Sequence, residues 1–291
     1  MPILPSQFQF FDRAANGLAI SRSSDMAWEG VAEDDALAEK LACAETWRFY
    51  PPRRSTSVFR PYTLDWFRDI EKRRYARHGQ WITRLLEFHR HHGETVLGLG
   101  DGLGTDWVRY TECGADFYYC NSSAEMVAIV KRNFDLRGLS GRFIHSKPTD
   151  IPLLSGSIDV ICLSFLSAQW SLPLDLLVAE IFRLLKPGGK LIAVLPAKYN
   201  STYWQNILFP WKNLLAGSGN DPSFHWSDRS VRKLLAAFAI SKIQKRHLRR
   251  ADLPHVWRWM LLPYLERFMG RFLIVKSFKP LAQPVCVPLA A

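Results

Sequence analysis

The sequence predicts an α/β fold built on a seven-stranded, mostly parallel sheet with helices on both faces. From residue 94 onward, short apolar runs alternate with helical stretches, the pattern of parallel strands joined by crossover helices. A glycine-rich loop follows the first of these runs. The chain of 291 residues, 48% of them hydrophobic and 22% charged, is long enough for one large domain with additions.

The region before the sheet is expected to be a helical extension and linker, residues 1–62. Within it, residues 28–45 are acidic, rich in alanine and predicted to be helical, and a connector rich in Pro and Arg follows. Two more helices are predicted at 63–77 and 80–90, because apolar residues recur there at helical spacing. We expect them to pack against the sheet.

The first five strands and their helices follow in order. We predict strands at 95–99, 117–120, 142–145, 158–163 and 190–195. Helices are predicted at 105–113, from Ser122 onward and at 174–185. Ser122 and Glu125 have the spacing of a capping box, and the Lys-Pro-Gly-Gly run at 186–189 marks a helix end.

The rest of the chain is predicted to complete the main domain, 63–279. Residues 197–226 are rich in Asn, Ser, Pro and aromatic residues and are interpreted as a cap inserted after strand five. A helix, a strand, a Trp-rich helix and a last strand are predicted at 228–238, 240–247, 253–269 and 272–278. Residues 280–291 are expected to be a loose, Pro-rich tail.

The net charge of +11 is concentrated near the C-terminus, where residues 240–280 contain ten Lys or Arg and two acidic residues. Such a block can attract nucleic acid, an anionic membrane surface or an acidic substrate. A solvated basic face is favoured, because apolar residues interrupt the charges. Trp257, Trp259, Leu261 and Leu262 are interpreted as the inner face of a helix rather than a membrane-seeking patch.

A cytoplasmic protein without a transmembrane segment is expected. The N-terminus lacks the basic start and apolar stretch of a secretory signal, and the longest uncharged stretch, 160–174, is too short to span a bilayer. Five cysteines occur without a Cys-x-x-Cys pair, which argues against disulfides and against a metal site. The sequence leaves the oligomeric state open.

The glycine loop, VLGLGDGLGTD, places Gly100, Gly102 and Gly104 between a strand and a helix. Without Cβ atoms the backbone can approach a ligand closely there, and helix N-terminal amides point toward it. The dinucleotide pattern Gly-x-Gly-x-x-Gly fails, because its last position is Leu103 or Thr105, and this disfavours NAD. A P-loop is excluded, since no Gly-Lys-Ser/Thr follows. A tight turn without a ligand is the alternative.

Four segments in order carry a family resemblance: this loop, SSAEM at 122–126, IDVI at 158–161 and EIFRLLKPGGKL at 180–191. Together they resemble type 11 class I S-adenosylmethionine-dependent methyltransferases, with a Rossmann-like fold, over roughly residues 66–279. The resemblance implies S-adenosylmethionine as cofactor and transfer of its methyl group to a small-molecule acceptor.

The resemblance also implies site residues. The glycine loop would bind the methionine part of the cofactor, Asn121 the ribose, and Asp150 with Ile151 the adenine edge. The residues expected to bind the cofactor are Gly100, Asp101, Gly102, Gly104, Asn121, Ser122, Met126, Asp150 and Ile151. Those expected on the substrate side are Trp170, Tyr199, Tyr203 and His225, with Asn200, Trp204 and Trp226 as further candidates.

Three acidic positions of the family pattern are replaced, by Gly98, Asn121 and Lys147. Each hydrogen bond to a charged group contributes roughly 1.5–3 kcal/mol, so losing three weakens cofactor binding by orders of magnitude unless Asp101 or Asp150 compensates. A pair of histidines found in relatives after strand four is also missing, and no catalytic residue is assigned.

Two alternative functions remain open. One is a catalytically degenerate scaffold or interaction subunit, supported by the joint loss of the three acids. The other is a nucleic-acid protein, suggested by the basic C-terminal block. The sequence after strand four lacks the Asn/Asp-Pro-Pro-aromatic motif of base-amine methyltransferases, which counts against the latter.

Overall fold

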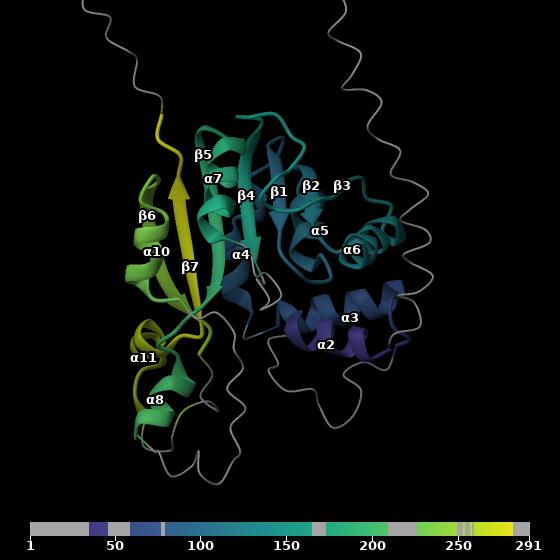
Figure 1. Cartoon of the computed structure of the whole chain (residues 1–291). Coiled ribbons are helices and arrows are strands. Elements are labelled where there is room, and N and C mark those ends of the chain that lie inside the picture. Colours follow the sequence, from purple (N-terminus) through teal and green to yellow (C-terminus); the bar gives the residue numbers. More distant parts are fainter. Residues whose placement is uncertain are drawn as a thin grey trace, which may run out of the picture.

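The computed structural model describes residues 35–45, 59–76, 79–164, 173–208, 226–248, 253, 257 and 259–281. A single seven-stranded sheet forms its centre, in the order β3-β2-β1-β4-β5-β7-β6 (Figure 1). In chain order the strands are β1 (Thr95–Leu99), β2 (Asp116–Asn121), β3 (Arg142–His145), β4 (Ile158–Ser164), β5 (Leu185–Pro196), β6 (Ala239–Arg246) and β7 (Phe272–Phe278).

The helices lie on both faces and at one end of the sheet (Figure 1). They are α2 (Asp35–Glu45), α3 (Leu64–Arg74), α4 (Gln80–Leu86), the short 3₁₀ helix η1 (Phe88–Arg90), α5 (Thr105–Glu112), α6 (Ala124–Leu136), α7 (Leu174–Leu184), α8 (Ser201–Leu208), α10 (Asp228–Leu234) and α11 (Leu262–Met269). No helix among the described residues is long and apolar enough to cross a membrane.

The sheet is mostly parallel, as the sequence predicts. Neighbouring strands from β3 to β5 pair in parallel, while β7 pairs antiparallel with both β5 and β6. The strand order reverses between β1 and β4, so the loops after these two strands leave in opposite directions. Ligands of open α/β sheets bind at such a point, outside the carboxyl ends of the strands.

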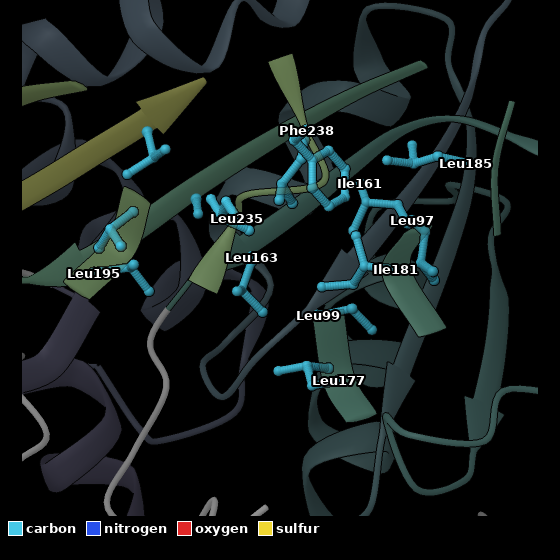
Figure 2. Close-up of a cluster of buried hydrophobic side chains, with 14 of the residues drawn as sticks. Leu97, Leu99, Ile161, Leu163, Leu177, Ile181, Leu185, Leu195, Leu235 and Phe238 are labelled. Atoms are coloured by element: carbon cyan, nitrogen blue, oxygen red, sulfur yellow. The ribbon is translucent and has the colours of Figure 1, made fainter. Parts of the chain in front are cut away.

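Two hydrophobic layers cover the two faces of the sheet, so its central strands are buried on both sides. In β1, Val96 points into the layer formed with α4, α5 and α6, and Leu97 into the layer formed with α7 and α10. Figure 2 shows this second layer, where Leu97 and Leu99 lie among side chains such as Ile161 and Ile181. Burial on both sides explains the continuous apolar runs of the sequence.

The N-terminal helices α2 and α3 form a third cluster at the carboxyl end of the sheet. Trp66, Phe67 and Ile70 of α3 pack with α2, with Leu103 of the glycine loop and with Met126 of α6. Figure 1 shows α2 and α3 beside the end of β1, with α8 and α11 at the same end of the sheet beyond β5. The extension is therefore part of the region where a ligand is expected.

Three local expectations are wrong. The N-cap of α6 is Ser123, whose side chain accepts from the Met126 N–H at 3.3 Å, so the predicted capping box at Ser122 is one residue early. The helix before the run at 186–189 ends at Leu184, as expected, but β5 already begins at Leu185 and not at residue 190. Within the described part of the helix predicted at 253–269, the α-helix is α11, and Met260 and Leu261 just before it are not helical.

The Trp-rich segment also differs from its predicted packing. Trp257 and Leu262 pack against the small cluster around Leu265, as expected. In contrast, the side chains of Trp259 and Leu261 are 92% and 68% exposed. The interpretation of these two residues as an inner helical face is therefore wrong, since the described helix starts only after them.

Because Trp259 has almost no protein contact to lose, Trp259→Ser is expected to change the free energy of unfolding by less than about 0.5 kcal/mol. Trp66 is 2% exposed, and Trp66→Ala is expected to cost about 3–5 kcal/mol. Urea unfolding of both variants measures the difference. A large loss in Trp259→Ser would mean that this indole is packed in solution.

The C-terminal end of α4 is fixed to the sheet by one carboxylate. Glu87 accepts from Lys190 of β5 and approaches Lys276 of β7, each at 2.7 Å. Burial would raise the pKa of Glu87, but the hydrogen bonds and charges of the two lysines outweigh it and lower this pKa from 4.5 to about 2. The unfolded chain lacks these lysine contacts, so ionised Glu87 stabilises the folded state.

This shift predicts a pH dependence with a definite sign. A carboxyl whose pKa is lowered by folding contributes stability above its unfolded pKa, and the contribution is lost as the pH falls through the folded value. We expect Glu87→Gln to be less stable than the native protein near neutral pH, with the difference shrinking as the pH falls from 4.5 toward 2. Thermal unfolding at several pH values measures it, and a difference independent of pH would contradict the assignment.

Candidate functional site

The glycine loop connects β1 to α5 at the carboxyl end of the sheet. Gly100, Gly102 and Gly104 all have positive φ, of 130°, 143° and 76°. These values lie in the region that side chains disfavour. A β-carbon at Gly100 would overlap the carbonyl oxygen of Ser164, the last residue of β4. The glycines therefore permit both the turn and the close approach of the β1 and β4 ends.

Two side chains from β2 donate hydrogen bonds to this loop. The Tyr119 hydroxyl donates to the Gly100 carbonyl at 2.9 Å, and the Asn121 amide donates to the same oxygen at 3.0 Å and to Asp101 Oδ1 at 3.1 Å. The Asn121 carbonyl oxygen accepts from the Ser123 N–H at 2.8 Å. Burial, with the charge of Asp101 adding to it, raises the pKa of Tyr119, so this residue stays a neutral donor.

The loop also contacts a buried cluster of three charged side chains, Glu45, Arg74 and Asp106, one of which belongs to the N-terminal extension. Arg74 of α3 makes a two-point contact with the Asp106 carboxylate of α5 and lies 3.1 Å from a carboxylate oxygen of Glu45 at the end of α2. The other Glu45 oxygen accepts from the Leu103 N–H of the loop at 2.8 Å. All three charged side chains are at most 4% exposed.

The cluster holds two carboxylates for one guanidinium. Burial alone would lower the pKa of Arg74, but the charges of Asp106 and Glu45 outweigh it and raise this pKa. Burial raises the pKa of Glu45, against the attraction of Arg74 and with the repulsion of Asp106. Tyr75 also donates to Asp106, at 2.8 Å. The chain thus places a carboxylate of its own against the glycine-loop backbone.

Sequence reasoning missed Glu45 and Arg74 as parts of this site. One signal was present, because Arg74 follows Trp66 and Ile70 at intervals of four residues, on the inward face of α3. A charged residue at an apolar helical position needs a buried partner. Nothing in the pattern identified that partner as Glu45, 29 residues earlier.

At the same end of the sheet, residues after β5 form an aromatic group. Tyr199 and Tyr203 meet edge to face with ring centroids 5.0 Å apart, and Lys198 and Lys245 lie 5.9 and 5.7 Å from the Tyr199 ring. Burial lowers the pKa of Lys245, against the opposing charge of Asp228. Tyr199 is 37% exposed and therefore accessible to a ligand.

The other predicted substrate residues divide into two groups. Trp170 and His225 lie outside the described residues. Asn200 caps α8, since its side chain accepts from the Tyr203 N–H at 3.0 Å. Trp226 forms an isolated parallel bridge with Ala197 and is 8% exposed. Their roles toward a substrate stay predictions.

Comparison with known proteins identifies the central segment. Residues 96–193, which run from β1 through β5, match the family described as a methyltransferase domain. This segment is similar to that family, and the sheet has the fold of the class I methyltransferases. The match includes the glycine loop, Asn121 and the reversal point of the sheet, and it stops before α8.

The curated relatives match only part of this chain. Demethylmenaquinone methyltransferase of Beutenbergia cavernae is 29% identical over 151 residues, 48% of this chain and 59% of the relative. Malonyl-[acyl-carrier protein] O-methyltransferase of Pectobacterium atrosepticum is 29% identical over 111 residues, 38% of this chain and 41% of the relative. The chain thus spans only about half the length of these relatives.

Solved structures support the fold of the methyltransferase domain. A methyltransferase of Methanosarcina mazei superposes with a TM-score of 0.51 at 16% identity, covering 67% of this chain and 97% of the other. Geranyl diphosphate C-methyltransferase of Streptomyces coelicolor gives 0.50 at 14% identity, covering 83% and 98%.

The groups around the methyltransferase loop differ in their availability to S-adenosylmethionine. Asp101 is half-buried at the loop, while Ser122 and Asp150 are exposed. Asn121 is 0% exposed, and its side chain is hydrogen-bonded within the protein. Neither observation supports its predicted contact with ribose. Ile151 is 2% exposed and its N–H donates to Glu180 at 2.8 Å. Met126 packs against the N-terminal helices.

Asp101, Ser122 and Asp150 are therefore at least partly exposed at this end of the sheet. Asn121 contacts the loop through the Gly100 carbonyl and Asp101. The direct contacts predicted for Asn121, Met126 and Ile151 stay predictions.

The structure gives a physical reason for the missing acid at Gly98. A β-carbon there would lie 2.7 Å from the Phe117 ring and 3.0 Å from the Trp107 ring. The space that a family acid would need is filled by two aromatic side chains, which are 1% and 3% exposed.

Restoring that acid is therefore expected to harm the protein. We predict that Gly98→Glu lowers the free energy of unfolding by at least about 1–3 kcal/mol through overpacking and does not raise affinity for S-adenosylmethionine. Thermal unfolding and calorimetric titration measure the two effects. In a Phe117→Leu background the destabilisation should become smaller. Tighter cofactor binding by Gly98→Glu would show that space for the acid exists.

Proposed function

We propose that the protein transfers a methyl group from S-adenosylmethionine to a small-molecule acceptor. The observation that carries this proposal is the glycine loop at the carboxyl end of β1, where the strand order reverses, inside the segment that matches the methyltransferase family. That end of an open α/β sheet is where such folds bind their ligands.

In this proposal the residues of the chain bind and orient. The backbone of residues 100–104 lies against the methionine part of the cofactor, Asp101 and Ser122 face its polar groups, and Asp150 faces the adenine edge. Tyr119 and Asn121 fix the Gly100 carbonyl. The cofactor supplies a methyl group already activated on a sulfonium. Correct placement of the acceptor can then provide much of the rate without a base.

The acceptor side is assigned to the aromatic group after β5. Tyr199 and Tyr203 present ring faces near the carboxyl end of the sheet, and aromatic faces attract cations such as a sulfonium. The relative from Beutenbergia cavernae is named for a small molecule, demethylmenaquinone. This name supports a small-molecule acceptor without identifying it.

Calorimetric titration with S-adenosylmethionine and S-adenosylhomocysteine tests the proposal. We expect saturable binding to the native protein and an affinity about tenfold or more weaker in Asp101→Ala, since hydrogen bonds to charged groups contribute about 1.5–3 kcal/mol. Asp116→Ala is the matched control, because Asp116 is exposed at the opposite end of β2. Equal affinities in both variants would refute the assignment of Asp101.

A second candidate, a methyltransferase-fold scaffold without cofactor binding, is favoured by one observation. Glu45 already occupies the Leu103 N–H, and Asn121 is satisfied within the protein. The same titration separates the candidates. Absence of binding of either compound to correctly folded protein supports the scaffold.

A further inference from the structure

A cavity lies between α4 and the part of the sheet formed by β5, β7 and β6. Its volume is about 390 Å³, within the range of small-molecule sites. Five of its ten lining residues are cationic, and one is acidic. The cations are Arg84, Arg90, Lys190, Lys242 and Lys276, and the acid is Glu87.

The cations converge from segments far apart in the sequence. Arg84 belongs to α4 and Arg90 to η1, whereas the lysines come one each from β5, β6 and β7. Lys242 and Lys276 stand directly opposite each other across the β6–β7 pair. Like charges in that position are destabilising, so the arrangement favours an anion between them.

Glu87 neutralises only part of this charge. Its two carboxylate oxygens are taken by Lys190 and Lys276, and Arg90 lies 3.5 Å away with a 76% exposed side chain. Within the described part of the chain no carboxylate pairs with Arg84 or Lys242. The cavity therefore keeps an excess of four positive charges, and its concave walls focus their field.

The cavity is separate from the methyltransferase site. Lys190 of β5 is level with Val160 of β4, which pairs with Val96 near the start of β1. The glycine loop leaves from the other end of β1. A ligand in the cavity would thus lie toward the amino ends of the strands, on the face covered by α4.

We propose that this cavity binds a small polyanion of the class of phosphate-bearing or diphosphate-bearing metabolites. Ammonium and guanidinium groups on several sides match the oxygens of a phosphate. Ile274 and Phe278 also line the cavity and provide apolar surface for the carbon part of such a ligand. This assigns part of the basic C-terminal block, Lys242 and Lys276, to a ligand rather than to a solvated face.

The test is calorimetric titration of the full chain with inorganic pyrophosphate at low ionic strength. We expect a single saturable site in the native protein and about tenfold weaker binding in Lys242→Gln, from loss of a charge-assisted contact. Lys242 is exposed and unpaired in the described region, so this variant is expected to fold. Lys233→Gln, an exposed lysine of α10 outside the cavity, is expected to bind like the native protein.

A second variant is expected to change the affinity for pyrophosphate in the opposite direction. Glu87→Gln removes the internal competitor for Lys190 and Lys276, so pyrophosphate should bind more tightly to it, although the protein is less stable. Four results would overturn the proposal: no saturable binding, equal losses in Lys242→Gln and Lys233→Gln, no gain in Glu87→Gln, or binding of RNA without binding of pyrophosphate. None depends on whether methyl transfer occurs.

Discussion

Replacing Arg74 by alanine is expected to lower the free energy of unfolding by about 3–5 kcal/mol. The guanidinium is the only cation in contact with Asp106 and Glu45 among the described residues, and the three side chains are at most 4% exposed. Without it, two carboxylates stay buried near each other without a counter-charge. The N-terminal extension and the glycine loop should loosen together, because this cluster connects them.

Urea unfolding measures the effect, and the neighbouring arginine provides a matched control. Arg73 pairs with Asp69 on the surface of α3, with side chains 31% and 18% exposed. Such pairs contribute about 0.3–0.5 kcal/mol, so Arg73→Ala should change little. Similar losses in the two variants would mean that the buried cluster is not a major source of stability.

Replacing Gly100 by alanine is expected to lower the free energy of unfolding by more than about 3 kcal/mol, beyond ordinary overpacking. The added carbon would overlap the Ser164 carbonyl, a backbone atom that cannot rotate away. The φ of 130° adds backbone strain. The ends of β1 and β4 must then separate at the point where the ligand is expected.

Gly138→Ala is the control for this second prediction. Gly138 also has positive φ, of 65°, but nothing lies within 4 Å of an added β-carbon. The left-handed conformation alone costs about 1–2 kcal/mol. If thermal unfolding shows equal losses for Gly100→Ala and Gly138→Ala, steric contact with Ser164 is not the reason for the glycine.

The sheet could be predicted because each strand carries its own local signal. Strands such as β1 and β4 are apolar on both faces and are followed by turn residues or helices, so their existence and order follow from the pattern. The last helix was predicted to start too early, although a local signal for its start was present in the sequence. Pro263 sits in the first turn of α11, and a proline there starts a helix rather than continuing one.

The site was predictable only as a location. The glycines are close in sequence, whereas the Glu45–Arg74–Asp106 cluster joins three segments whose contact depends on the packing of α2 and α3. The roles of Gly98 and Asn121 also depend on residues that are near them only in the folded protein. The Phe117 and Trp107 rings fill the space beside Gly98. The Gly100 carbonyl accepts a hydrogen bond from the Asn121 amide. Sequence alone shows what replaced the family acids but not what surrounds the replacements.

The central claim, that S-adenosylmethionine binds at the glycine loop, is tested most directly by amide hydrogen exchange with and without saturating S-adenosylhomocysteine. Binding in the proposed site predicts slower exchange in peptides covering residues 100–104 and 121–123, and no change in β6. Unchanged exchange in both loop peptides, or protection confined to other parts of the chain, would contradict it.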